Sequence, residues 1–236
     1  MRHARPGAFA FIFTSILCGH PVLVSAFPPY RTTDADTADP RTLELRIGAV
    51  KVDWDRGHSE ILSPLLRANL GIGGKFEIIS ELEYSPRTGE LGDGALGAKW
   101  IPVYNGRTGA GIETLVLLPV RPGDRGSGIE SQLVVTRRLD KLRLHLNAGG
   151  FHDSRIAPAQ NGWRCSALVE FELGDWRPGL EIFAKQVSGE KVDMRLGAGA
   201  IAKYGKFDLR TGLHVGLTDK APDVSVNLWF STNLPF

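Results

Sequence analysis

The sequence predicts an all-β fold, a transmembrane antiparallel up-and-down β-barrel of about twelve strands. Twelve segments alternate apolar and polar residues with a period of two, the pattern of a strand with one apolar face. Their lengths match the roughly 9–11 residues that a tilted strand needs to cross a bilayer. Their polar faces carry nearly equal numbers of acids and bases, as expected where charges meet across an enclosed lumen, since an unpaired enclosed charge is costly.

The chain opens with a predicted secretory signal peptide, residues 1–26. Arg2 and Arg5 precede an apolar stretch at 8–17 that is too short to span a bilayer. Small residues at the end of the segment form a cleavage pattern. Its removal leaves 28 − 2 = 26 basic residues against 26 acidic ones, so the mature chain is formally neutral. This balance favours no nucleic-acid partner. The one remaining cysteine, Cys165, excludes an internal disulfide.

Residues 27–41 form a segment rich in proline and aspartate. We expect it to be flexible and extended, lying on the periplasmic side or in the mouth of the barrel. Asp34, Asp36 and Asp39 could bind a cation, but we favour a solvated polar tail. The four histidines beyond the leader are too scattered for a metal motif, so neither a metal nor another cofactor is expected.

Residues 42–236 are expected to form the barrel, with strands separated by turns rich in glycine, proline, asparagine and aspartate. The alternating residues that mark these strands fall within 43–50, 63–73, 76–84, 96–100, 109–119, 128–138, 142–148, 163–173, 180–185, 194–202, 207–217 and 223–236. A slip of phase near Gly48 indicates a bulge in the first strand. An even number of strands puts both ends on the side with the shorter turns. Ten or fourteen strands remain alternatives.

The final segment, 223–236, keeps its alternation to the last residue. A free apolar end strand would fray and expose an edge, so the pattern predicts that it closes the barrel against the first strand. The segment also resembles the last strand of bacterial outer-membrane barrels, which ends in phenylalanine. That resemblance implies recognition of Phe236 by the barrel-assembly machinery.

Aromatic residues gather near the ends of the expected strands, as the two interfaces of a membrane favour. One group is Trp54, Tyr84, Phe151 and Trp163, and the other is Phe76, Tyr104, Phe171, Tyr204, Phe207 and Phe236. The apolar faces are therefore expected to meet outer-membrane lipid. A soluble periplasmic lipid-binding barrel, with those faces turned inward, is the less favoured arrangement.

The polar face of the strands is expected to line the lumen. Its mid-strand residues are Arg46, Arg67, Glu81, Lys99, Glu113, His145, Glu170, Lys185, Arg195 and Arg210. They could form a charged pathway that selects small solutes, or a salt-bridge network that fills and closes the barrel. Because twelve strands lie between filled and open barrels, both remain open. The closed form is slightly favoured, and the loops look too short to fold inward as a constriction.

Four glycines of the last strands are expected to make room for bulky lumen side chains or to let the barrel bend. These are Gly197, Gly199, Gly212 and Gly216. An enzyme is the weakest hypothesis. The triplet at 152–154 and nearby Ser166 contain nucleophile and base types, but neighbouring loop residues rarely reach the required geometry. We predict no catalytic residue.

Three short motifs stand out in the chain, FPPYRTTDAD at 27–36, GDGALGAKW at 92–100 and LPV at 118–120. They resemble motifs of a family of outer-membrane proteins linked to phenol-degradation (meta-pathway) gene clusters. All three are structural rather than catalytic. The resemblance implies an outer-membrane barrel of channel or transporter type whose cargo is unassigned.

We therefore expect a β-barrel of the Gram-negative cell outer membrane that acts as a channel or transporter for small molecules, amphipathic or aromatic ones by the resemblance. The alternative is a non-transporting barrel that serves a structural or envelope-interaction role. The sequence leaves open the cargo, the oligomeric state and whether the lumen is open.

Overall fold

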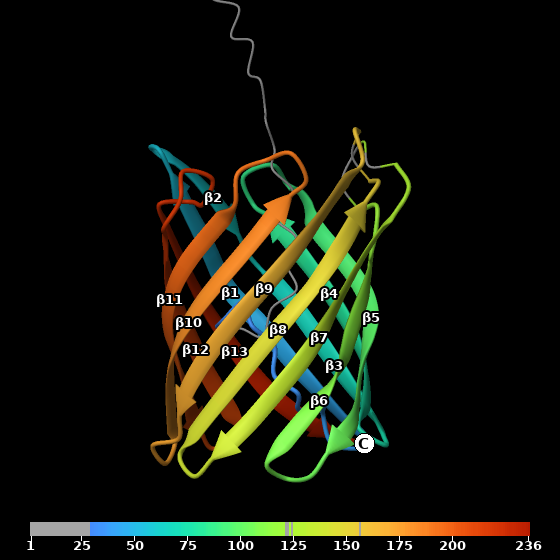
Figure 1. Ribbon diagram of the computed structural model, residues 1–236, viewed down its shortest axis with the longest axis vertical. Helices are drawn as coiled ribbons and strands as arrows, with labels where there is room; N and C mark the ends of the chain where they lie inside the picture. The colour runs from blue at the N-terminus through green and yellow to red at the C-terminus, as the bar shows by residue number, and fades with distance from the viewer. Residues whose placement is uncertain (1–28, 121–122, 124, 156) are drawn as a thin grey trace, which may run out of the picture.

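The computed structural model describes residues 29–120, 123, 125–155 and 157–236, so the expected leader lies outside the described residues. The described chain is a closed antiparallel β-barrel in which strands that follow one another pair side by side (Figure 1). The strands are β1 (Thr42–Asp55), β2 (His58–Leu62), β3 (Leu65–Gly73), β4 (Phe76–Ser85), β5 (Glu90–Tyr104), β6 (Thr108–Leu117), β7 (Gly128–Leu139), β8 (Leu142–Asp153), β9 (Gln160–Phe171), β10 (Trp176–Val187), β11 (Asp193–Tyr204), β12 (Phe207–Gly216) and β13 (Val224–Pro235).

The barrel wall has twelve crossings, because β2 and β3 are two halves of one crossing. Both pair with β1, β2 along its second half and β3 along its first half. The break between them falls at Ser63 and Pro64, and proline cannot donate to a ladder. The expected count of twelve is confirmed. The separate strand β2 was not predicted, because its short run follows the Arg56-Gly57 turn without clear alternation.

The last strand closes the barrel on the first, as the terminal alternation predicts. The β1–β13 ladder runs from Thr42 opposite Pro235 to Trp54 opposite Val224, with the predicted bulge just after Gly48. Closure removes the free sheet edges that an open sheet would present. Both ends of the barrel sequence therefore lie together, and the backbone amide of Phe236 donates to the carbonyl of Arg41.

The two mouths of the barrel differ. We call the mouth near Phe236 the turn end, where the connections are short, at 74–75, 105–107, 140–141, 172–175 and 205–206. The opposite mouth, the loop end, carries longer connections that include 118–127 and 217–223. No helix long and apolar enough to cross a membrane occurs in the described part of the chain.

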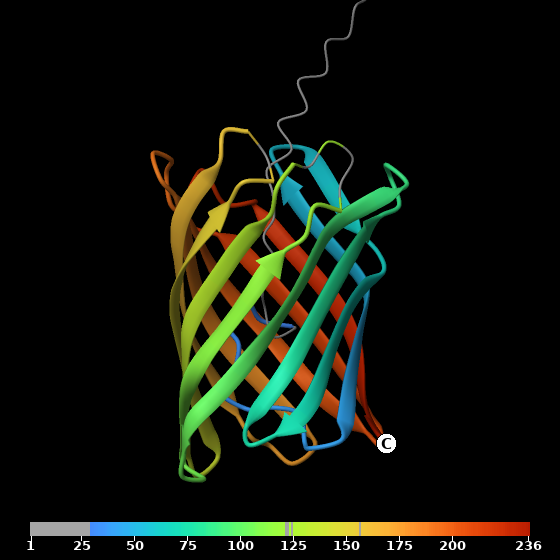
Figure 2. The same ribbon diagram turned by 90° about the vertical axis from the view of Figure 1, so that its right-hand side faces the viewer.

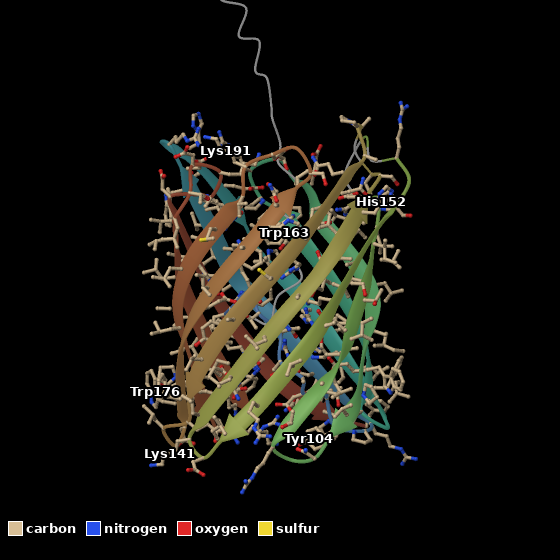
Figure 3. All side chains as sticks on the ribbon, viewed as in Figure 1. Tyr104, Lys141, His152, Trp163, Trp176 and Lys191 are labelled. Carbon is tan, nitrogen blue, oxygen red and sulfur yellow. The ribbon has the colours of Figure 1, made fainter. Side chains whose placement is uncertain are left out.

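The barrel is apolar outside and charged inside, the reverse of a soluble protein. Leu133 is 63% exposed and Leu180 59%, whereas Lys99 and Glu113 on the opposite face are each 1% exposed. Figure 3 shows Trp163 nearer the loop end and Tyr104 and Trp176 near the turn end, and all three side chains are exposed. This orientation argues against a soluble barrel with inward apolar faces.

One aromatic residue was assigned to the wrong face. Phe151 is only 6% exposed and lies in an inner cluster with Ile79, Leu115 and Leu117. It lies an even number of residues after His145 and Asn147 and so shares their inner face, but its aromatic ring led to the outer assignment. The lumen is therefore not uniformly polar.

We expect the folded protein to show heat-modifiable mobility in detergent gels. A closed ladder has no edge for detergent to invade, so the unboiled barrel should stay compact and migrate faster than the boiled chain. A variant ending at residue 223 lacks β13 and should migrate alike with and without boiling. An intact chain with one unshifted band would contradict a closed barrel.

Candidate functional site

The candidate site is the barrel lumen. All ten residues that the sequence assigns to it stand on the inner face of their strands; eight are buried, and Glu81 and Lys185 are less fully buried. Most of them form ion pairs with one another or with neighbours along the wall. The lumen is thus lined by compensated charge rather than by free ions of one sign.

The first network joins β3, β4, β5 and β6. Arg67 pairs with Glu81 across the β3–β4 ladder, and its Nη2 atom lies 3.2 Å from Oε2 of Glu113. Lys99 Nζ lies 3.0 Å from Glu77 Oε1 and 4.0 Å from Glu113 Oε2. Three carboxylates therefore share two cations, and each cation bridges neighbouring strands.

A second network crosses the closing seam of the barrel. The guanidinium of Arg46 donates to both oxygens of Glu44, at 2.9 and 2.6 Å. Arg210, on β12, reaches the same carboxylate at 3.2 Å and donates to Ser231 Oγ at 2.9 Å. These contacts tie β12 and β13 to β1.

Two buried histidines also contact carboxylates. His145 Nε2 lies 3.0 Å from Glu170 Oε2, and His145 Nδ1 lies 2.9 Å from Thr136 Oγ1. His214 Nε2 lies 2.8 Å from Glu181 Oε2. Both residues lie on the polar face expected to line the lumen, although neither was among its ten mid-strand residues.

We call residues 29–41 the N-terminal segment, and residues 29–38 of this segment lie inside the barrel. Figure 2 shows this blue segment inside the strands, well below the loop end. The sequence suggested the periplasmic side or the mouth of the barrel, with a flexible chain. Instead Tyr30, Thr32, Thr33 and Ala35 are all at most 1% exposed.

Lumen side chains bind the backbone of this segment from several strands. The amide of Thr33 donates to Asn147 Oδ1 at 3.0 Å, and the amide of Ala35 donates to Thr136 Oγ1 at 2.7 Å. The amide of Ala38 donates to Glu77 Oε2 at 2.7 Å. These three contacts alone come from β8, β7 and β4.

Among these wall residues, Glu181 accepts several hydrogen bonds from the segment. Its Oε2 atom accepts from the amide of Arg31 at 2.9 Å, and its Oε1 atom accepts from the amide and hydroxyl of Thr32. At the far end, Asn227 Nδ2 donates to the carbonyl of Pro29 at 3.1 Å. The segment therefore spans the lumen and is held by opposite walls.

Acids of the segment are paired with the wall rather than solvated. Lys99 Nζ lies 3.7 Å from Asp34 Oδ1 and donates to the Asp34 carbonyl at 3.3 Å. Asp36 pairs with Arg138, and its Oδ2 atom lies 3.6 Å from Arg143. Asp39 is exposed. The predicted solvated tail thus describes Asp39 but neither Asp34 nor Asp36.

Glycines on the inner face leave the space that the N-terminal segment occupies. A Cβ atom at Gly179 would lie 2.7 Å from Tyr30 Oη, and one at Gly199 would lie 2.9 Å from Tyr30 Cε1. A Cβ at Gly212 would lie 2.6 Å from the carbonyl oxygen of Pro29. The expected role of making room for a lumen side chain fits Gly197, whose Cβ would lie 2.4 Å from His214.

An apolar patch interrupts the charged lining. Ile79, Ala95, Leu115, Leu117 and Phe151 form a buried cluster on the inner face, and Val187 packs against it. Leu115 and Leu117 had blurred the alternation of their strand, because there the inner face is apolar as well. The lumen thus offers both charged and apolar surface.

The side chains considered for catalysis, His152 and Ser154, contact other groups rather than each other. His152 and Asp153 end β8 rather than lying in a loop, and His152 Nδ1 lies 2.7 Å from Asn161 Oδ1. Ser154 Oγ donates to the carbonyl of Ser127 at 2.6 Å. Figure 3 shows His152 at the loop end. The described residues include no group of three side chains that could hold a metal ion.

A surface hollow of about 780 Å³ lies at the loop end, among residues that include Arg56, Lys191 and Lys220. Its charges are already matched. Lys191 Nζ lies 2.9 Å from Asp219 Oδ2, and that hydrogen bond lowers the pKa of Asp219. Lys220 Nζ lies 2.7 Å from Glu190. The hollow therefore shows no unmatched charge that would select a ligand.

Comparisons with known proteins rest on structure. No family model matches the sequence, and no curated protein matches it. A solved KdgM porin matches with a TM-score of 0.61 and 10% identity, over 81% of this chain and 98% of that one. A COG4313 outer membrane channel from Pseudomonas putida F1 matches with a TM-score of 0.61 and 11% identity, over 89% of this chain and 100% of that one. At such identities the likeness concerns the fold, and the chain has the barrel fold of porins and outer-membrane channels.

Proposed function

We propose that this protein is an outer-membrane channel for small molecules, and that its N-terminal segment closes the lumen. The observation that carries the proposal is the set of hydrogen bonds from lumen side chains on opposite walls to the backbone of residues 29–38. A side chain that binds a backbone amide specifies where the segment lies without specifying its sequence. The charged lining would then set which solutes pass once the segment moves.

The segment is held in a way that permits release. It adds no strand to the barrel, and the hydrogen bonds described above join its backbone to side chains. Each such bond contributes roughly 0.5–1.5 kcal/mol, more where the acceptor is charged. Moving the segment would therefore leave the twelve-crossing wall intact. A barrel whose lumen was filled only by its own wall could not open this way.

The compartment and cargo are part of the proposal. Residues 1–26 would act as a cleaved leader, and Phe236 would present the last strand to the barrel-assembly machinery. The exposed apolar wall between aromatic ends suits outer-membrane lipid. The resemblance of three short motifs to those of the phenol-degradation family supports amphipathic or aromatic small molecules as cargo.

A second candidate is a structural barrel that does not transport. The density of lumen ion pairs favours it, because Arg67, Lys99 and Arg210 each contact carboxylates on more than one strand. Such networks could serve rigidity alone. The two candidates differ in whether ions cross when the N-terminal segment is freed.

A reversible lock on the segment separates them. The Ala35 amide nitrogen lies 2.7 Å from Thr136 Oγ1, so we expect the thiols of Ala35→Cys and Thr136→Cys to come within reach of a disulfide. Cys165 is exposed on the outer wall and would be replaced by serine. In planar bilayers we expect the oxidised variant to stay closed and reductant to bring back the openings of the unlocked protein. Thr136→Cys alone in the same background should not respond to reductant.

Two outcomes would contradict the proposal. Equally low conductance with and without reductant, in the lock and its parent, would favour the structural barrel. Equally high conductance in both states would mean that the segment does not close the lumen.

A further inference from the structure

Two lumen cations lack a carboxylate partner. Neither Arg31 nor Lys185 forms an ion pair with an acid among the described residues, although ion pairs are abundant around them. Arg31 belongs to the N-terminal segment, and Lys185 projects from the inner face of β10. Enclosed charge without compensation is costly, so this pair stands out from the rest of the lining.

The two cations gather around aromatic rings. Arg31 Cζ lies 5.2 Å from the ring centre of Phe183, and Arg164 Cζ lies 5.4 Å from the same centre. Lys185 Nζ lies 4.7 Å from the ring centre of Phe151. Phe183 and Lys185 are two residues apart on one strand face, so their side chains are neighbours.

The acids nearest to Lys185 are already paired with other cations and do not neutralise its charge. Lys185 stands opposite Arg164 on β9, and Arg164 pairs with Glu130. On its other side Lys185 stands opposite Asp193, whose carboxylate is bound by Arg195 at 2.8 and 2.5 Å. Glu130 and Asp193 are thus each engaged by another arginine.

The carboxylate of Glu181 is likewise committed, because it accepts from His214 and from the segment backbone. Asp53, on β1, has Lys51 as its partner at 3.6 Å. Because each surrounding acid is bound by another partner, the positive charges of Arg31 and Lys185 remain uncompensated.

Apolar surface borders the two cations. Phe151 is a member of the inner apolar cluster with Leu115 and Leu117, and Val187 packs against that cluster. Val187 follows Lys185 by two positions and shares its face. An ion bound here would have charge on one side and aliphatic and aromatic carbon on the other.

We propose that Arg31 and Lys185 form a lumen binding site for a small amphipathic carboxylate, a carboxylate with a short apolar body. The carboxylate would lie between the two cations, in a setting where charge-assisted hydrogen bonds are strong. The apolar body would lie along Phe151 and its cluster. Because Arg31 is part of the N-terminal segment, the bound anion would connect that segment to the wall. The inference rests on the proposed channel function and names its substrate class.

The test measures binding without ion flow. The full barrel in lipid nanodiscs is titrated with hexanoate by isothermal titration calorimetry. We expect Lys185→Gln and Arg31→Gln each to weaken binding about tenfold or more, the loss of one charge-assisted contact. Lys51→Gln removes a lumen lysine that has its own partner, Asp53, and should leave the affinity within about twofold. Acetate and hexanol should bind far more weakly than hexanoate, because acetate lacks the apolar chain and hexanol lacks the carboxylate.

Absence of hexanoate binding, or binding that all three variants leave unchanged, would overturn the site. Equal affinity for hexanoate and hexanol would overturn the role of the cations. The result is independent of the disulfide lock. If hexanoate binding depends on Lys185 but the barrel never conducts, the binding site stands and the channel function is rejected. If the barrel conducts but does not bind hexanoate in this way, the channel function stands and the binding site is rejected.

Discussion

Replacing Arg67 by methionine is expected to lower the free energy of unfolding of the barrel by about 3–5 kcal/mol. The Arg67 side chain is 2% exposed and sits between the carboxylates of Glu81 and Glu113. It also donates to Asn69 Oδ1 at 3.1 Å. Methionine fills similar volume but leaves two like charges facing each other in an enclosed space. The cost is the desolvation and mutual repulsion of those carboxylates, not lost packing.

The measurement is urea unfolding of the barrel in lipid vesicles, with Lys191→Met as the matched control. Lys191 also forms one close ion pair, but its side chain is 76% exposed, so its loss should cost less than about 1 kcal/mol. Adding Glu81→Gln to Arg67→Met should recover part of the loss, because one of the uncompensated charges is gone. A cost below about 1 kcal/mol for Arg67→Met would mean that water reaches the network freely.

Much of the wall could be predicted because one face of each strand must meet lipid. Strands β12 and β13 show this best, since their alternation survives to the chain end and their pairing follows. The inner charges on those strands follow from the same period. Prediction failed where the inner face is also apolar. Leu115 and Leu117 face the lumen, and periodicity carries no signal when both faces are apolar. Phe151 also faces the lumen, and it was misassigned because its aromatic ring suited the membrane interface.

The N-terminal segment could not be placed from sequence, because its contacts are remote along the chain. Thr32 and Glu181 are 149 residues apart, and local composition says nothing about such a partner. A segment of proline and aspartate reads as solvated when considered alone. A usable signal was present in Gly199 and Gly212, which leave open space on the inner face of neighbouring strands. That space was assigned to side chains of the wall, and at these two positions Pro29 and Tyr30 of the N-terminal segment fill it.

Those glycines lead to the prediction with the largest expected effect on conduction. Gly212→Val should raise the open population of the channel about tenfold, since overpacking costs about 1–3 kcal/mol and about 1.4 kcal/mol is a factor of ten. A Cβ at Gly212 would lie 2.6 Å from the Pro29 carbonyl oxygen and 3.1 Å from Pro29 Cβ and Asn227 Nδ2. The clash therefore falls on the N-terminal segment and one flexible side chain. Valine otherwise suits a strand, so the wall should tolerate it.

Single-channel recordings compare this variant with Gly150→Val. Gly150 is exposed, and the nearest atom to its Cβ would be the Gly162 carbonyl oxygen at 3.3 Å, so that change adds the same side chain without touching the segment. We expect Gly150→Val to conduct like the unmodified protein and Gly212→Val to open more often with the same ion selectivity. The selectivity should persist because the charged wall is unchanged and only its occupant moves. If both variants open as rarely as the parent, the segment yields at Pro29 without leaving the lumen, and closure depends on its deeper contacts from Thr33 to Ala38.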